Sequence, residues 1–441
     1  MKLHDEQQEA FDFIMEFIDK DRGPITYGYE NMCVLGGYAG TGKSTTIQEL
    51  VFALSESGHK VCITAPTNKA VKVLIKMARE WGLEGISTIT IYSLLGLVLK
   101  QERDKEVIRQ DGENKIHKYD VVVVDEGSMV NSELMKYLKA ATISNPGLTV
   151  LFVGDPGQIP PVNEEESLVF KKNIRHQFFL KTIRRQAEHN PVINNSLAVR
   201  KVMDEIDGGG KYSAPLFNPQ ENEHGGFHLV DKGDLGKYLQ ASFTPEWYPE
   251  QVRFICWTNK VMDSINQMAH KLVMGKTPYK FTEGETVCFR SVVVNSDNRV
   301  IVPLETEGRV NFIKQTRHVE YNFPCYEMDI TTEDDKDVSI YSLIPGNSDK
   351  FYDILGGLAN QAKAAKPRDR REKWGEFWDL KTSIINIKHT YAITAHRSQG
   401  STFENVLVLG SDIIKNHKEK EMIRLMYVSL TRPSSQAVLF V

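Results

Sequence analysis

Apolar residues in the first 180 positions follow two different spacings that alternate along the chain. Helical spacing predicts helices over Glu6–Asp19, Thr45–Leu54, Asn68–Glu80 and Met129–Ala141. Short uninterrupted apolar runs lie between them and predict strands, at Met32–Leu35, Val61–Thr64, Val121–Val124 and Thr149–Val153. Strands that are apolar on both sides and alternate with helices are typical of a parallel sheet covered on both faces. We therefore expect an α/β unit made of residues 1–92 and 119–183.

Residues 93–118 interrupt this alternation. Leu97–Lys118 is rich in charge and contains Asp111-Gly112, a dipeptide that favours the tight turn of a β-hairpin. We expect an inserted hairpin with its tip near these two residues. Such a hairpin could act as a wedge between nucleic-acid strands, and a plain surface hairpin is the alternative.

The strand and helix pattern returns after about Ile183 and predicts a second α/β unit, made of residues 184–274 and 385–441. Between these parts, residues 275–384 show short β-like runs separated by turns, followed by a helical stretch over Phe351–Ile384 that Pro367 interrupts. We expect a small β-barrel insertion with helices. The short runs are Val287–Phe289, Val292–Val294, Val300–Val302, Arg309–Ile313, Tyr326–Ile330 and Val338–Ile340.

Composition narrows the class of protein without indicating a ligand. The 441 residues exceed what one hydrophobic core usually serves, and the formal net charge of −4 gives no bulk sign of nucleic-acid binding. Five cysteines, an odd number without metal-ligand spacing, are expected as reduced thiols. The first residues lack an apolar signal region, and no apolar run approaches the length of a membrane span. We expect a cytoplasmic protein.

One motif has specific chemistry. Gly37–Ser44 reads G-x-x-x-x-G-K-S between a predicted strand and a predicted helix, which is the complete phosphate-binding loop. Its glycines allow backbone N–H groups to surround phosphates, Lys43 is expected on the β- and γ-phosphates of ATP, and the Ser44 hydroxyl on Mg²⁺. The expected nucleotide-binding residues of this segment are Gly37, Gly40, Thr41, Gly42, Lys43, Ser44 and Thr45.

Acidic and amide side chains follow the next strands. Asp125 and Glu126 come directly after the four-valine run, so we expect Asp125 to hold Mg²⁺ and Glu126 to activate the attacking water. A helix-capping role for Glu126 is the alternative. Gln158, after the strand that ends at Val153, is a candidate for contact with the γ-phosphate, although Pro-Gly and Pro-Pro around it also fit a simple turn.

The order of these motifs resembles superfamily 1 helicases, in particular the branch that contains the RecD subunit and the phage Dda helicase. The resemblance spans nearly the whole chain. It rests on Leu3–Phe11, Ala65–Ala70, Gly154–Pro161, Leu180–Gln186, Thr394–Thr402 and Tyr427–Arg432, together with the aromatic segment Trp374–Lys381. Three positions depart from the pattern of the branch: Tyr92, Gly127 and Pro433.

The resemblance implies two RecA-like domains with ATP between them and an SH3-like insertion at residues 275–384. It implies that Gln7 reads the adenine, that Gly400 lies in the motif that senses the γ-phosphate, and that Arg185 and Arg432 act as arginine fingers. Tyr92 occupies the place of a DNA-contacting histidine. The other expected DNA-binding residues are Pro66, Thr67, Asn68, Trp257, Asn259, Thr394 and His396, with a core position as the alternative for Trp257.

The expected function is ATP- and Mg²⁺-dependent movement in the 5′-to-3′ direction on single-stranded DNA, with unwinding of forked duplex. We expect a monomer, in a bacterial or phage-infected cell, that serves DNA replication, repair or recombination. Two alternatives stay open. One is an RNA helicase of the same superfamily, and the other is a nucleotide-switched nucleic-acid-binding module without processive unwinding.

Overall fold

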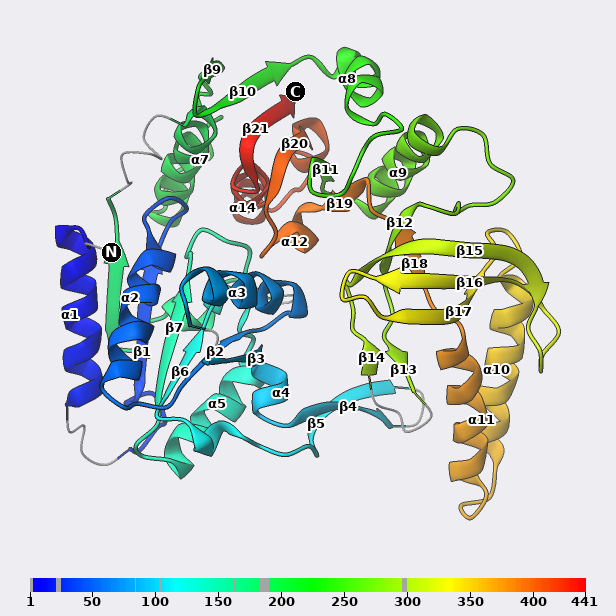
Figure 1. Ribbon diagram of the computed structural model, residues 1–441, viewed down its shortest axis with the longest axis horizontal. Helices are drawn as coiled ribbons and strands as arrows, with labels where there is room; N and C mark the ends of the chain where they lie inside the picture. The colour runs from blue at the N-terminus through cyan, green and yellow to red at the C-terminus, as the bar shows by residue number, and fades with distance from the viewer. Residues whose placement is uncertain are drawn as a thin grey trace.

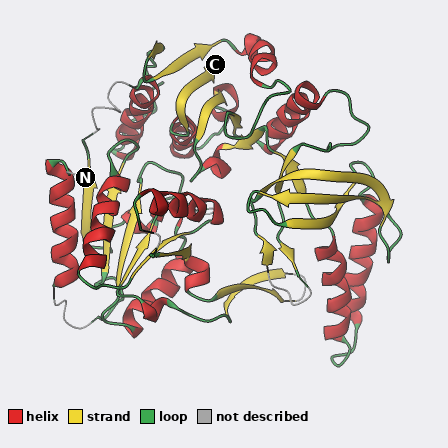
Figure 2. Ribbon diagram, in the orientation of Figure 1, coloured by secondary structure: helices red, strands yellow, loops and turns green. Residues whose placement is uncertain are grey.

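The chain forms two α/β units and a third, mainly antiparallel β unit with a helical pair (Figures 1 and 2). The computed structural model describes residues 3–20, 25–83, 85–102, 105–161, 164–182, 190–295 and 300–441. In the described part of the chain, no helix is both long and apolar enough to cross a membrane. All five cysteines are buried free thiols, as expected.

The first unit is built on a six-stranded parallel sheet, the predicted α/β fold. Its strands are, in spatial order, β3 (Ser87–Thr90), β2 (Val61–Ala65), β6 (Val121–Val124), β7 (Thr149–Gly154), β1 (Met32–Gly37) and β8 (His176–Leu180). Its main helices are α1 (Asp5–Asp19), α2 (Lys43–Glu56), α3 (Asn68–Glu80), α4 (Ile91–Leu94) and α5 (Ser132–Ser144). Strands β3 and β8 were not predicted, because β3 has one apolar residue, Ile89, between threonines and the apolar run of β8 is only Phe178–Leu180.

Successive residues of the central strands pack into two different cores, one on each face of this sheet. Val121 and Val123 of β6 join the core beneath α1, α2 and α3, whereas Val122 and Val124 join the core beneath α4 and α5. Because side chains alternate along a strand, a strand buried on both faces has to be apolar throughout. The four-valine run therefore fixes β6 in the middle of the sheet, and Asp125 begins where it ends.

The second unit repeats this plan. Its sheet has the strand order β19 (Ala392–Thr394), β11 (Val252–Cys256), β20 (Phe403–Leu409), β21 (Pro433–Phe440), β10 (Gly225–Val230) and β9 (Gln220–Asn222). All pairs are parallel except that of β9 with β10. The helices are α7 (Pro191–Asp207), α8 (Leu235–Ser242), α9 (Asn259–Met274), α12 (Ala395–Ser398), α13 (Gly410–Ile413) and α14 (Glu419–Leu430).

The third unit is a five-stranded antiparallel sheet with its own apolar core. Its strand order is β17 (Asp337–Leu343), β16 (Pro324–Thr332), β15 (Glu307–Arg317), β12 (Thr286–Phe289) and β18 (Ile387–His389). Beside it lie the short pair β13 (Val293–Val294) and β14 (Val300–Val302) and the helices α10 (Asp349–Ala364) and α11 (Arg370–Ser383), separated near Pro367 as expected. Strand β18 pairs with β12 and so lies in this sheet, although the sequence prediction assigned residues 385–441 to the second α/β unit.

The hairpin of residues 93–118 consists of β4 (Leu97–Glu102) and β5 (Lys105–Gln110). The pairing runs from Leu97 with Gln110 to Glu102 with Lys105. The predicted tip at Asp111-Gly112 is wrong, because the amides of both residues donate to the carbonyl oxygen of Gly96 at the base of the hairpin. The Asp-Gly pair thus returns the chain to the first unit and does not form the tip.

Candidate functional site

The phosphate-binding loop lies where β1 ends and α2 begins, as predicted. Gly40 and Gly42 have φ angles of 80° and 84°, in the left-handed region that favours glycine. The Lys43 ammonium lies within the loop and donates to the carbonyl oxygens of Gly37 (2.6 Å) and Tyr38 (3.0 Å). Thr41 is buried, and its hydroxyl donates to the same Tyr38 carbonyl (2.8 Å). These contacts shape a loop with Ser44 and Thr45 in the first turn of the helix behind it.

Gln7 reaches the same loop from α1. Its side chain is buried, its amide nitrogen donates to the carbonyl oxygen of Gly42 at 3.0 Å, and its amide oxygen accepts from the backbone N–H of His4 at 3.3 Å. The structure therefore places the predicted adenine-reading residue directly beside the phosphate loop.

Asp125 and Glu126 lie at the carboxyl end of β6. Burial, and then the neighbouring Glu126 carboxylate, raise the pKa of Asp125 to about 7. Glu126 adopts a left-handed backbone conformation with φ of 52°, which is uncommon for a residue with a side chain. The next residue is Gly127, where the branch usually has alanine or valine. A Cβ at this position would lie 3.1 Å from the carbonyl oxygen of Val153, so a side chain would crowd β7.

The loop after β7 lies between the two α/β units. The Gln158 amide oxygen accepts from the Ser128 hydroxyl at 3.0 Å, and the Gln399 amide nitrogen lies 3.4 Å from the same oxygen. Gln399 also donates to the carbonyl oxygen of Ile159 at 3.1 Å. Gln158 is therefore held between the first unit and the motif that precedes Gly400 in the second.

Tyr427 of α14 joins the second unit to two loops of the first. Its hydroxyl donates to the Asp155 carboxylate at 2.7 Å and accepts from the backbone N–H of Ala39 at 3.1 Å. The residue is buried, and burial, with Asp155 next, raises its pKa well above the ordinary value. Tyr427 is therefore a neutral phenol, and its O–H group donates a hydrogen bond to the Asp155 carboxylate.

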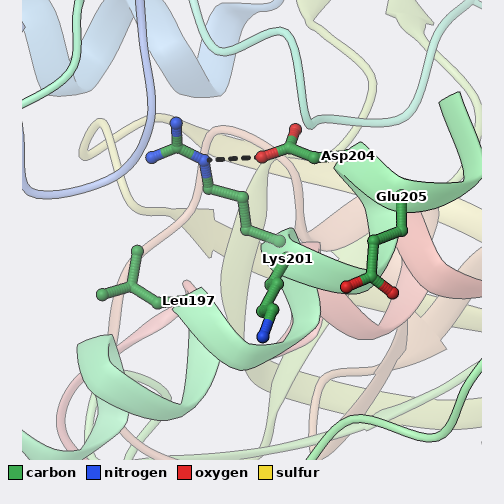
Figure 3. A pocket seen from close by; sticks show the side chains of 5 residues that line it. Leu197, Lys201, Asp204 and Glu205 are labelled. Carbon is green, nitrogen blue, oxygen red and sulfur yellow. Dashed lines mark ion pairs between the residues drawn. The ribbon is translucent and has the colours of Figure 1, made fainter. Parts of the chain in front are cut away.

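Tyr38 makes a second bridge. Its hydroxyl lies 3.0 Å from an Asp204 carboxylate oxygen of α7, and its ring packs edge-on against that of Tyr427. Figure 3 shows Asp204 on this helix, with a dashed line for its 3.6 Å ion pair with Arg200. The Arg200 guanidinium lies 3.2 Å from the centre of the Tyr38 ring, within the range of a cation–π contact.

The structure brings one of the two predicted arginine fingers to the boundary between the units. Arg432 is buried just after α14, and its guanidinium donates to the carbonyl oxygens of Val428 (3.0 Å) and Ser401 (3.2 Å). Arg185 lies outside the described residues. Gly400 has a φ of 70°, and a Cβ on it would lie 3.8 Å from the Glu126 carboxylate. Gly400 therefore lies beside Glu126, the residue that we expect to activate the attacking water.

The predicted nucleic-acid residues of the first unit lie after β2 and after β3. Pro66 and Thr67 are half-buried and Asn68 is exposed at the start of α3, where the Thr67 hydroxyl caps the helix by accepting from Ala70 N–H. Tyr92 is half-buried against the core of the first unit.

The corresponding residues of the second unit lie at the carboxyl ends of β11 and β19. Thr394 is buried at the start of α12, and His396 lies 3.5 Å from the Glu421 carboxylate. Trp257 packs partly against the core, whereas Asn259 is exposed at the start of α9. Strands β11 and β19 are neighbours, so these residues share one edge of the sheet.

Acids of the third unit face basic residues of both α/β units. Lys72 of α3 lies 2.9 Å from both Glu333 and Asp334. Glu307 accepts two 2.7 Å hydrogen bonds from Arg253 and lies 3.9 Å from Lys69. The third unit is thereby tied to α3, next to the predicted strand-binding residues.

Sequence reasoning missed Tyr38, Tyr427, Asp204 and Gln399. The first two lie inside motifs that were noticed for other residues, and their partners are remote: Ala39 and Tyr427 are separated by 388 positions. One signal was available in the sequence. Tyr38 and Tyr427 each lie in a motif of the ATP site, and the two motifs are expected to come together in the fold.

Comparison with known proteins finds a family match at each end of the chain. Residues 25–208 match the family described as AAA domain, and residues 389–440 match the UvrD-like helicase C-terminal domain. The chain is 25% identical to the ATP-dependent DNA helicase Dda of Enterobacteria phage T4, over 98% of this chain and 97% of that one. It is 34% identical to the ATP-dependent RecD2 DNA helicase of Deinococcus radiodurans over 48% of this chain and 31% of that one. These matches confirm the resemblance of the chain to superfamily 1 helicases.

Two solved Pif1 helicase structures share the fold. The Pif1 helicase from Bacteroides in complex with ADP-AlF3 and single-stranded DNA has a TM-score of 0.51 at 18% identity, covering 100% of this chain and 93% of that one. A structure of two coordinating Pif1 helicases at forked duplex DNA has a TM-score of 0.50 at 18% identity, covering 99% and 92%. The shared fold thus extends over nearly the whole chain.

Proposed function

We propose that this chain is an ATP-dependent DNA helicase that moves 5′-to-3′ on single-stranded DNA and unwinds duplex. The single observation that carries the proposal is the Tyr427 bridge, which joins the phosphate loop at Ala39 and the loop after β7 at Asp155 to the helix that precedes Arg432. A nucleotide bound between such units acts on both at once. Closure on ATP and opening after hydrolysis give a two-state element, which a motor needs.

In this proposal the residues of the site divide the work. Gln7 holds the adenine, Lys43 and the loop amides hold the phosphates, and Glu126 takes a proton from the attacking water. Arg432, with Arg185, neutralises charge that develops on the γ-phosphoryl group. Arginine fingers contribute about 10³–10⁵ in rate in other phosphoryl-transfer enzymes. Because Arg432 belongs to the second unit, hydrolysis depends on closure of the two units.

We also propose Mg²⁺ as the metal. The Ser44 hydroxyl and the Asp125 carboxylate offer the hard oxygen ligands that this ion prefers. Burial and the nearby Glu126 disfavour charge on Asp125 in the protein alone, so a cation there would stabilise the ionised form. When bound, Mg²⁺ neutralises phosphate charge during transfer.

The third unit and the hairpin complete the proposal. We assign residues 275–384 with β18 to the SH3-like insertion of this branch, and the β4–β5 hairpin to the wedge that meets the fork. Asn68, Asn259, Thr394 and His396 mark a strand path along the edges of both α/β units. Lys69 and Lys72 lie beside that path, in contact with acids of the third unit.

The test is steady-state ATP hydrolysis with no polymer, with single-stranded DNA and with single-stranded RNA of the same sequence. The proposal predicts strong stimulation by DNA and loss of all turnover in Lys43→Ala. Stimulation by RNA equal to or greater than that by DNA would favour an RNA helicase. Slow hydrolysis that neither polymer changes would favour a nucleotide-switched binding module.

A further inference from the structure

A cavity of about 560 Å³ opens between the second half of α9 and the five-stranded sheet, away from the phosphate loop. Its lining includes four lysines, Lys271, Lys276, Lys280 and Lys388, and a single aspartate, Asp263. We call it the lysine pocket. The chain as a whole is acidic, with a formal net charge of −4, so this concentration of positive charge is local.

A buried hydrogen-bonded cluster forms one wall of the pocket, which His270 and His389 line. The Thr277 hydroxyl uses its hydrogen on the carbonyl oxygen of Tyr279 (2.9 Å), so at 3.1 Å it can only accept from His270 Nε2. His270 Nδ1 lies 3.0 Å from Glu285, a carboxylate that also accepts from His389 and Tyr391. Glu285 is fully satisfied by donors, which favours a hydrogen-bonded cluster over a metal site.

Lys280 is a half-buried lysine in the lining of the pocket. Burial, and then the charge of Lys388, lower the pKa of Lys280. Lys388 is itself paired with both oxygens of Asp263 at 2.9 and 3.0 Å. Among the described residues no carboxylate lies within ion-pair distance of the Lys280 ammonium, which lies 4.7 Å from the Phe281 ring centre. A partly desolvated ammonium without a counter-ion is unfavourable, and an anion in the pocket would remove that cost.

The position of the pocket indicates which anion. Helix α9 begins at the exposed Asn259, on the proposed strand path, and its residue Lys271 lies in the pocket. Twelve residues of helix separate them by roughly 18 Å. The pocket offers ammonium groups, which recognise phosphate as point charges without reading a base. These are the properties of a contact to a nucleic-acid backbone.

We propose that the lysine pocket is a second phosphate site, which binds backbone phosphates of DNA outside the path that stimulates hydrolysis. The inference rests on the proposed function. Its ligand is a phosphodiester, and a free phosphate compound is the other source of the same chemistry.

The experiment compares Lys276→Gln/Lys280→Gln with Lys232→Gln/Lys237→Gln, which removes two exposed charges from the second α/β unit, outside the lining of the pocket. Binding of single-stranded oligonucleotides of increasing length is measured over a series of salt concentrations. Each lost phosphate contact lowers the slope of log K against log salt by about 0.7 on single strands. The pocket variant should lose about 1.4 in slope with long oligonucleotides only, and keep full stimulation of ATP hydrolysis by short ones. The control variant should match the wild type.

Three outcomes would overturn the inference. The first is an unchanged slope at every length, and the second is an equal loss at the shortest lengths. The third is calorimetric binding of inorganic pyrophosphate in a Lys43→Ala background that the pocket substitutions abolish while DNA binding stays unchanged, because this identifies a free phosphate ligand. Since Lys276 is exposed, Lys276→Gln alone keeps the test open if the double variant misfolds. Failure of the wild type to bind DNA of any length would instead reject the proposed function.

Discussion

Individual residues of the nucleotide site followed from local rules. Gly40 and Gly42 take the left-handed conformations that the loop needs, and Asp125 follows directly from the end of an apolar strand. Tyr427 could not be predicted in this way, because its role depends on two partners in another part of the chain. Local chemistry identifies a loop, whereas contacts between loops require the folded molecule.

Glu126→Gln should bind ATP with near-normal affinity and hydrolyse it about 10²–10⁴ times more slowly, since only proton transfer is removed. Single-turnover hydrolysis and equilibrium binding of a labelled nucleotide measure the two effects separately. Lys43→Ala is the comparison and should weaken binding as well. Normal turnover in Glu126→Gln would reject its assignment as the base.

Tyr427→Phe should uncouple the units without unfolding either. The substitution removes the hydroxyl that serves both Ala39 and Asp155, and hydrogen bonds to charged groups are worth about 1.5–3 kcal/mol. We expect DNA-stimulated hydrolysis to fall about tenfold or more, with little change in hydrolysis without DNA. Tyr391→Phe, another buried tyrosine, bonded to a different carboxylate, is the control. Equal stimulation in wild type and Tyr427→Phe would contradict the bridge.

At the scale of elements, periodicity predicted the apolar strands and long helices well, including Asn68–Glu80 and Val121–Val124 with their exact bounds. It failed where the decisive information is pairing. The Asp-Gly pair does lie next to a hairpin, but the register pairs Leu97 with Gln110, so Asp111 and Gly112 lie at its base. Strand β18 likewise pairs with β12 and lies in the sheet of the third unit, although its place in the chain suggested the second α/β unit.

Gly157 lies where α7, α14 and the phosphate loop meet, so adding one methyl group to it tests whether this packing is needed for hydrolysis. A Cβ on Gly157 would lie 2.9 Å from Met203 Cε and 3.1 Å from the rings of Tyr38 and Tyr427. We expect Gly157→Ala to push the two units apart and lower DNA-stimulated hydrolysis several-fold. Gly147→Ala, which has no atom within 4 Å of the added Cβ, is the matched control and should change nothing. Unaltered hydrolysis in Gly157→Ala would show that the contact can open freely.

At the scale of the whole molecule, the two α/β units and the insertion between their parts were predictable from the alternation of patterns, but their mutual arrangement was not. The third unit is held to α3 by Lys72 with Glu333 and Asp334, residues that sequence inspection treats as ordinary surface charges. Surface ion pairs contribute little to stability individually. We therefore expect the ion pairs of Lys72 to break when a DNA strand binds beside α3.

The central claim is that closure of two units on ATP drives movement along one DNA strand in one direction. The most direct measurement is unwinding of two labelled duplexes, one with a 5′ single-stranded tail and one with a 3′ tail, with ATP and with Lys43→Ala as control. The account predicts that the wild type separates only the duplex with the 5′ tail and that Lys43→Ala separates neither. Separation of only the 3′-tailed duplex would contradict the proposed direction, and separation of neither would contradict the motor itself.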